Sequence, residues 1–419
     1  MAQNQLITIV PILDKKCDIL SDHLRSIRIE LLKGVKPDFE AFNSIHFARW
    51  VIIDREIPGF PTPTSAIPKL CFVVDYDGTQ AELFKNLSTV SSAMIDGIYC
   101  YCEDYPLENK RTEESRIAFF NRHTIKNTSV YIGAPGRSLQ QIRDESRLRN
   151  YLRDYLDFLS LKRGPAKEIH EKLRTKIMSE NDFEFLKTPV KMPKINWFGM
   201  ALIGLILLVL SPLLILWILM VQFFYERKDE VFTMKRSQLD NQALSTLETY
   251  EDIYNQNQFT QLVEMKPGIV RLITINGMFM LANGLIRFFF VKGKLMGIPS
   301  IHFARWVLFD DNKRVLFFSN FDGSWQQYLG DFIDKSGWGL TGIFSNTKVF
   351  PKTKFLLTGG AYDEEHFLAW SRHSQLPTDV WYSAYPQLSI KNINNNTKIR
   401  TLLMKDLSEK QAAKFLQLL

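Results

Sequence analysis

The sequence predicts an α+β protein built from two ferredoxin-like β-α-β-β-α-β repeats, with a membrane-embedded helical segment between them. Two observations lead to this prediction. The first is that the octapeptide SIHFARWV occurs twice, at residues 44–51 and 300–307. The second is that residues 195–225, in the middle of the chain, carry no charged side chain. A chain of 419 residues has room for both features in two or three domains.

The two octapeptides belong to a longer internal duplication. Downstream of them, DYDGT at residues 75–79 corresponds to NFDGS at residues 320–324. The tripeptide RHT that begins at Arg122 corresponds to RHS beginning at Arg372. An identity of eight residues that includes His, Arg and Trp is far beyond chance expectation. The two halves of the chain therefore share a common origin.

Each repeat has the same predicted order of elements. Runs rich in β-branched and aromatic residues are typical of strands. The strands predicted in this way cover residues 6–13, 45–54, 70–75 and 129–133 in the first repeat and residues 270–275, 301–310, 314–319 and 379–384 in the second. Helices are predicted over residues 17–32 and 278–291. A second helix should follow each Asp-Gly, because Thr79 and Ser324 stand at the N-cap of a capping-box pattern. This order is ferredoxin-like.

The segments outside the repeats are predicted to be helical. The stretches on either side of the uncharged run are rich in charged residues at helical spacing, which indicates amphipathic helices. The predicted domains are a first repeat (1–152), a charged helical connector (153–194), the membrane-embedded segment (195–225), a second helical connector (226–267), the second repeat (268–405) and a C-terminal helix (406–419).

The uncharged run is long enough to cross a bilayer. At about 1.5 Å per residue a helix of this length reaches roughly 45 Å, against about 30 Å for the hydrocarbon core. A single span would separate the repeats. Each predicted sheet has one bare face, however, and the other repeat is its natural cover. This favours a re-entrant segment that bends near Ser211-Pro212, since Pro removes a helix donor.

Composition bears on the cellular location and the partners. The 52 Lys and Arg residues exceed the 45 Asp and Glu residues by seven. This modest positive charge suits an anionic lipid surface, so we expect membrane lipid as a partner. The basic residues form no concentrated stripe, so we expect no nucleic acid as a partner. The N-terminus lacks the pattern of a signal peptide. Four cysteines without a disulfide framework favour a reducing compartment, so we expect the repeats on the cytoplasmic face. Cys100 and Cys102 have no counterpart in the second repeat, and no role is predicted for them.

The repeated strand carries the candidate polar site residues. Side chains alternate along a strand, so His46 and Arg49 point to opposite faces, as do His302 and Arg305. A buried Arg needs an acid, and the sequence suggests the pairs Arg49–Asp77 and Arg305–Asp322. Two alternatives follow. These residues line a pocket between the sheets, or they form structural ion pairs.

Aromatic residues gather near the matched positions and suggest a ligand. We expect the cleft between the two sheets to accept a small apolar or aromatic molecule. The predicted ligand-binding residues are His46, His302, Trp50, Trp306, Phe321 and Trp381.

With its FARW and [YF]DG[ST] motifs, the chain resembles the dimeric α+β-barrel superfamily, which includes the dye-decolourising peroxidases and chlorite dismutases. The resemblance implies an intrachain pseudo-dimeric α+β barrel. It also implies haem as an alternative cofactor, with His373 or His123 as its ligand. The implied catalytic residues are Arg305, Asp322, Arg49 and Asp77. The peroxidase GxxDG pattern is reduced here to Asp-Gly. A haem-dependent oxidoreductase and a non-catalytic structural membrane protein are therefore alternatives to a binding protein.

Overall fold

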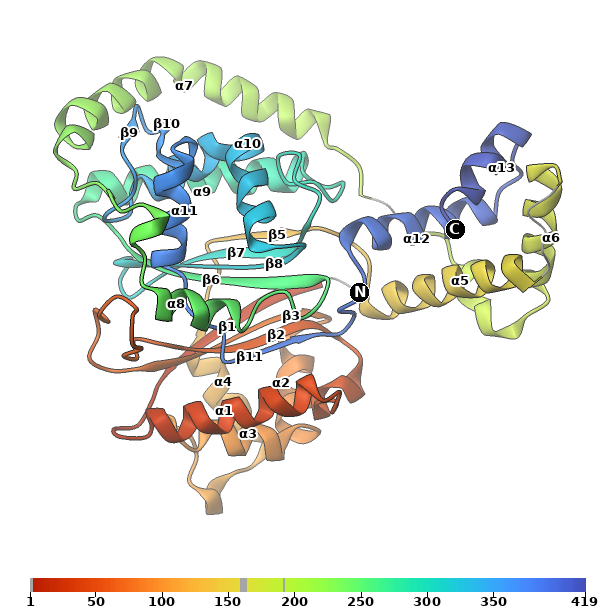
Figure 1. The fold of residues 1–419 in the computed structure, drawn as a ribbon, viewed down its shortest axis with the longest axis horizontal. Coiled ribbons are helices and arrows are strands. Elements are labelled where there is room, and N and C mark those ends of the chain that lie inside the picture. The colour runs from red at the N-terminus through yellow and green to blue at the C-terminus, as the bar shows by residue number, and fades with distance from the viewer. Residues whose placement is uncertain (1–2, 159–163, 191–192) are drawn as a thin grey trace.

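The computed structural model describes residues 3–158, 164–190 and 193–419 of the chain. Parts of the predicted first repeat and first connector, at residues 1–2, 159–163 and 191–192, lie outside the described residues. The chain forms an α+β fold in which two antiparallel sheets pack against each other between layers of helices (Figure 1). The coarse fold prediction is thus confirmed.

The first sheet has the strand order β11-β2-β3-β1-β4 and the second has the order β5-β7-β8-β6. The strands of the first sheet are β1 (Gln3–Pro11), β2 (Ile45–Ile53), β3 (Lys69–Asp77), β4 (Thr124–Ile125) and β11 (Val380–Ser383). Those of the second sheet are β5 (Ser129–Ile132), β6 (Gln256–Glu264), β7 (Ile301–Phe309) and β8 (Arg314–Asp322). Within the described residues these sheets do not close into a barrel, so the barrel implied by the resemblance is wrong.

The last strand of each repeat completes the sheet of the other repeat. β5 comes from the first half and pairs with β7, with Tyr131 opposite Ala304. β11 comes from the second half and pairs with β2, with Trp381 opposite Arg49. Both strands form where the sequence predicts them, and each pairs with a strand of the other half. The halves are therefore interlocked by an exchange of strands.

Helices cover the outer face of each sheet (Figure 1). The first sheet is covered by α1 (Cys17–Leu32), α2 (Gln80–Thr89), α3 (Ser92–Tyr99) and α4 (Glu113–His123). The second is covered by α9 (Ile269–Phe288), α10 (Trp325–Phe344) and α11 (Glu364–His373). A side arm with its own core consists of α5 (Leu139–Phe158), α6 (Ala166–Met178), α12 (Ile390–Leu403) and α13 (Glu409–Leu416). The connecting segments contain α8 (Asn241–Glu248), β9 (Thr353–Lys354), β10 (Thr358–Gly359) and 3-10 turns at Asp38–Phe42, Glu108–Lys110, Asn181–Lys187, Glu226–Lys228, Arg236–Gln238 and Gly360–Tyr362.

The first strand of the second repeat was wrongly predicted. Residues 270–275 belong to helix α9, and the strand is β6, inside the predicted helical connector. The reason is the composition of β6, QNQFTQLVE, whose Gln256, Asn257 and Gln258 are buried although they are polar. A search for alternating apolar residues does not find a strand whose buried side chains are amides.

Residues 197–224 form one helix, α7 (Trp197–Phe224), which runs through Pro212. The helix is therefore not interrupted at the predicted bend near Ser211-Pro212, and α7 follows a curved path (Figure 1). Pro212 cannot donate to the Leu208 carbonyl four residues earlier, but the Ser211 hydroxyl donates to that oxygen over 2.7 Å. The helix continues because the neighbouring side chain replaces the missing hydrogen bond.

Helix α7 lies antiparallel along the outer side of α9 (Figure 1). Near its start, Gly199 packs closely on the ring of Phe288. Towards its other end, the Trp217 indole donates to the Thr274 hydroxyl over 3.0 Å. By length and composition, the helical stretches Trp197–Lys228 and Ile269–Phe288 could each cross a membrane, and the most apolar part of the first stretch has no buried residue. The buried residues of α7 are Gly199 near its start and Val221 and Gln222 near its end.

The strand exchange predicts that neither half folds alone. Residues 1–158 lack β11 and α12, so their sheet edge and the apolar face of α5 would stay uncovered. We expect this fragment to show no cooperative thermal transition by circular dichroism in mild detergent. Co-expression with residues 164–419 should restore one. A sharp transition of the isolated fragment at the midpoint of the full chain would contradict the exchange.

Candidate functional site

The space between the two sheets is filled by side chains. Apolar residues from both inner faces meet there, among them Val51 and Val73 from the first sheet and Val307 and Phe318 from the second. These residues are at most 3% exposed. The centre of the interface is therefore a packed core, and hollows occur at its edges.

Two arginines cross this core in opposite directions. Arg49 of β2 donates to the carbonyls of Phe259 and Ser319, each over 2.8 Å. Arg305 of β7 donates to the carbonyl of Leu6 over 2.6 Å and to another in β3. Each guanidinium thus binds the backbone of the facing sheet. Burial lowers the pKa of Arg49 to about 9 and also lowers that of Arg305.

The acid between these arginines is Asp75. It pairs with Arg305 and accepts from the amide of Asn320 over 2.9 Å, while Arg49 donates to the amide oxygen of Asn320. Burial raises the pKa of Asp75, against the opposing effect of both arginines. The predicted pairs of Arg49 with Asp77 and of Arg305 with Asp322 are wrong. The arginines face the other sheet, so their partners lie there and not along their own hairpins.

The acids of the two Asp-Gly turns pair with the repeated histidines instead. The distance from Nε2 of His46 to Oδ1 of Asp77 is 3.2 Å, and the corresponding distance from His302 to Asp322 is 2.7 Å. A β-bulge at the start of β2 and of β7 turns these histidines towards their acids.

The second oxygen of each of these acids accepts a backbone N–H at the start of a side-arm helix. Asp77 accepts from Leu139 over 2.6 Å, and Asp322 accepts from Ile390 over 2.8 Å. A carboxylate at a helix N-terminus satisfies an orphan donor there. The aspartate of each repeated Asp-Gly therefore holds the N-terminus of the helix that follows an exchanged strand.

Tyr385 lies between the two histidines. Its hydroxyl is 3.0 Å from Nδ1 of His46, and its ring centroid is 5.9 Å from that of His302. Both histidines are at most 1% exposed. These contacts favour the structural alternative for the matched histidines and aspartates.

The other predicted ligand residues lie mostly in the helix-covered cores. Trp50 stacks on Phe72 at 4.6 Å between ring centroids. Trp306 and Phe321 pack in the second core. Trp381 is different, because it lines a hollow beside α1 while its indole donates to Asn320 over 2.9 Å.

The two histidines implied as haem ligands lie at the ends of helices that cover the outer faces of the sheets. His123 ends α4 beside Phe119, and His373 ends α11 beside Phe232. Burial lowers the pKa of both imidazoles. His373 is on the helix side of the second sheet, whereas Arg305 is on the opposite face. In the part of the chain that is described, no three His, Cys, Asp or Glu side chains are placed to share a metal ion.

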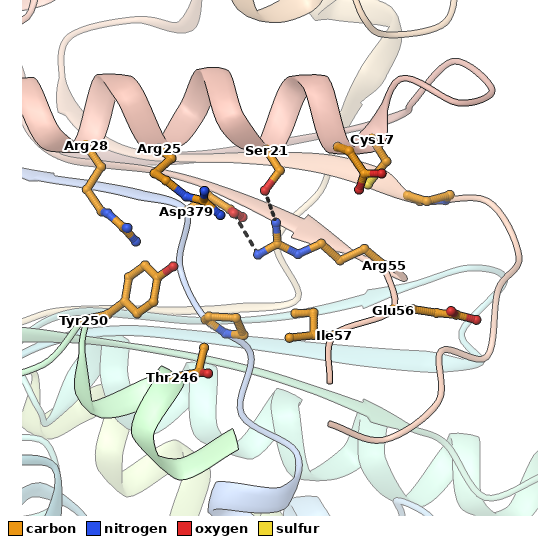
Figure 2. A pocket seen from close by; sticks show the side chains of 13 residues that line it. Cys17, Ser21, Arg25, Arg28, Arg55, Glu56, Ile57, Thr246, Tyr250 and Asp379 are labelled. Carbon is orange, nitrogen blue, oxygen red and sulfur yellow. Dashed lines mark hydrogen bonds and ion pairs between the residues drawn. The ribbon is translucent and has the colours of Figure 1, made fainter. Parts of the chain in front are cut away.

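A hollow of about 370 Å³ lies where the two halves meet (Figure 2). One wall is α1 with the residues after β2. The other includes Thr246 in α8, Tyr250 just after α8 and Asp379 before β11. Such a volume is within the range of small-molecule sites, about 300–1,000 Å³. We call it the seam cleft, because each half of the chain supplies one side.

An ion pair joins the two sides of the seam cleft. Arg55 binds Asp379 over 2.8 Å and donates to the Ser21 hydroxyl over 2.8 Å. The other oxygen of Asp379 accepts from the backbone N–H of Ile52 over 2.8 Å. Burial raises the pKa of Asp379, and the charge of Arg55 opposes that effect. The Arg28 guanidinium lies 4.1 Å from the centroid of the Tyr250 ring.

Sequence reasoning did not find the seam cleft. Cys17, Ser21, Arg25 and Arg28 recur at helical spacing on one face of α1, which was the available signal. The facing wall comes from a predicted connector and from the exchanged strand, so its position depends on pairing between distant segments.

No protein-family model, curated protein or solved structure matches the chain.

The cross-sheet network predicts a large loss of stability on removal of one arginine. Arg305→Ala would leave Asp75 buried without its cation, at a cost of about 3–5 kcal/mol in the free energy of unfolding. Denaturant unfolding measures this. Arg122→Ala, whose side chain is 65% exposed, is the control and should change the free energy by less than about 0.5 kcal/mol. Equal effects of the two substitutions would contradict the role of the network.

Proposed function

We propose that this is a membrane-associated binding protein, held on one face of a bilayer by α7, that receives a small ligand in the seam cleft. The observation that carries the proposal is the apolar surface of α7. Leu208 is 70% exposed, Val209 is 68% exposed and Leu216 is 63% exposed. A contiguous apolar patch of this kind marks a membrane or partner surface.

Neighbouring residues of α9 extend the apolar surface. Ile269 is 66% exposed and Met280 is 75% exposed. The basic residues Arg227 and Lys228 follow α7 and are suited to anionic headgroups. Lipid is the occupant that fits an extended apolar surface bordered by basic side chains.

Both ends of α7 are attached to the same folded body. At its start, the Asn196 N–H donates to the Phe288 carbonyl over 2.9 Å. Beyond its end, Glu226 accepts from the Leu356 N–H over 3.2 Å. A helix that crossed the bilayer would separate these two ends. The attachments therefore support a helix that lies along the membrane within one leaflet. The four free cysteines support the cytoplasmic leaflet.

Vesicle flotation tests the role of α7. Leu208→Asp combined with Leu216→Asp should lower the bound fraction at least ten-fold, because each carboxylate costs about 2.5 kcal/mol or more in hydrocarbon. The matched control replaces Leu107 and Phe158, which are 68% and 82% exposed elsewhere, by Asp. The control should float like the natural sequence. Equal flotation of both variants would contradict the proposal.

Thiol labelling tests the one-sided arrangement. Lys85→Cys in the first half and Lys313→Cys in the second place a thiol at exposed positions, with Cys17 and Cys100 replaced by Ser. In sealed vesicles of known orientation, an impermeant maleimide should label both sites from the same side. Labelling from opposite sides would mean that α7 crosses the membrane.

A further inference from the structure

We infer that the seam cleft binds a small organic anion, a carboxylate or phosphate ester that carries an apolar or aromatic group. The inference rests on the proposed function in one respect, namely that this cleft is the binding site. It replaces the purely apolar ligand expected from the aromatic residues with an amphiphilic one.

The seam cleft adjoins a second, smaller hollow of about 40 Å³ along the same helix. Both hollows are lined by Arg28 and Tyr250. Beyond these two residues the second hollow is lined by the apolar side chains of Leu31, Leu32, Ile253 and Trp381, next to the amides Gln256, Asn257 and Gln258 of β6. The two hollows thus form a groove along α1 with a charged part and an apolar part.

The α1 wall offers two guanidinium groups to a ligand. Figure 2 shows Arg25 and Arg28 extending from α1 towards Tyr250 and Asp379. Arg25 pairs with Asp22 at the surface over 3.2 Å, where the two side chains are 61% and 72% exposed. An exposed pair of this kind contributes little and exchanges readily for a better partner. The planar fork of Arg matches a carboxylate or a phosphate.

The acids of the groove do not cancel this positive wall. Asp379 is already compensated by Arg55 and by the Ile52 N–H. The other acids that line the hollow are Asp18 and Glu56. Glu56 and Cys17, which precedes Asp18 in the chain, lie at the other end of the hollow from Arg28 (Figure 2). The positive end is therefore the end that continues into the apolar hollow. A ligand placed there would have its anionic group at Arg25 and Arg28 and its apolar group near Leu32 and Trp381.

The position of the groove also favours a water-soluble ligand. α1 covers the outer face of the first sheet, while α7 lies beyond the helices of the second sheet. Both sheets thus separate α1 from the proposed membrane surface (Figure 1). A ligand that reaches α1 comes from the aqueous side, where a charged group keeps an aromatic molecule soluble.

Ligand-observed NMR on the full chain in nanodiscs tests the inference with defined probes. Benzoate and phenyl phosphate carry the required anion and ring, benzamide carries the ring alone, and inorganic phosphate carries the anion alone. We expect at least one of the two aromatic anions to bind at least ten-fold more tightly than benzamide and inorganic phosphate. Which of the two binds more tightly distinguishes a carboxylate ligand from a phosphate ligand.

Substitutions locate the binding. The double variant R25Q/R28Q should weaken binding of the aromatic anion at least ten-fold, and Arg28→Lys should retain part of it. The matched control is R147Q/R153Q on α5, whose side chains are 55% and 54% exposed, and it should bind like the natural sequence. If R25Q/R28Q does not fold, the exposed Arg25→Gln alone should weaken binding about three-fold.

Two results would overturn the inference. One is that neither aromatic anion binds more tightly than benzamide. The other is that the arginine variants bind as the control does. Vesicle flotation of the same samples separates the two proposals, because removal of these arginines leaves α7 unchanged. Lost anion binding with intact flotation would fit the inference, and absent flotation of the natural sequence would refute the membrane proposal alone.

Discussion

The structure depends on two arginines that reach across the interface between its sheets. A buried guanidinium must satisfy its donors, and Arg49 and Arg305 do so on the backbone of the facing sheet. This requirement fixes the distance and the register between the sheets. Because the same residue occurs in both repeats, the constraint acts twice, once in each direction. Asp75 and Asn320, which occupy matched positions, join the two arginines into one network.

The Asp-Gly turns connect the two sheets to the side arm. Each aspartate holds a repeated histidine with one oxygen and the start of a side-arm helix with the other. Each of these helices directly follows an exchanged strand. The aspartate that holds the start of the helix therefore also helps to hold the exchanged strand in the sheet of the other repeat. The recurrence of these motifs is thus explained by architecture. The rigid link between the halves also gives the seam cleft walls of fixed separation.

The two proposed surfaces are on different parts of this body. The apolar surface of α7 borders the helices of the second half, and the seam cleft lies along α1 of the first. The packed interface between the sheets separates them. Under the two proposals, the chain rests on lipid through α7 and presents to water a groove that both halves line.

The sequence by itself determined the features that depend on local patterns. These are the duplication, the paired strands of both hairpins, the bounds of α1, the N-caps at Thr79 and Ser324, and the apolar character of α7. The tertiary structure alone decided the partners of the exchanged strands, the strand β6 with its buried amides, the acid that faces Arg305 and the walls of the seam cleft. The physical reason is that local periodicity reports which side of an element is buried. It does not report which distant segment covers that side, because this choice is made by packing and hydrogen bonding between parts of the chain that meet only in the folded protein.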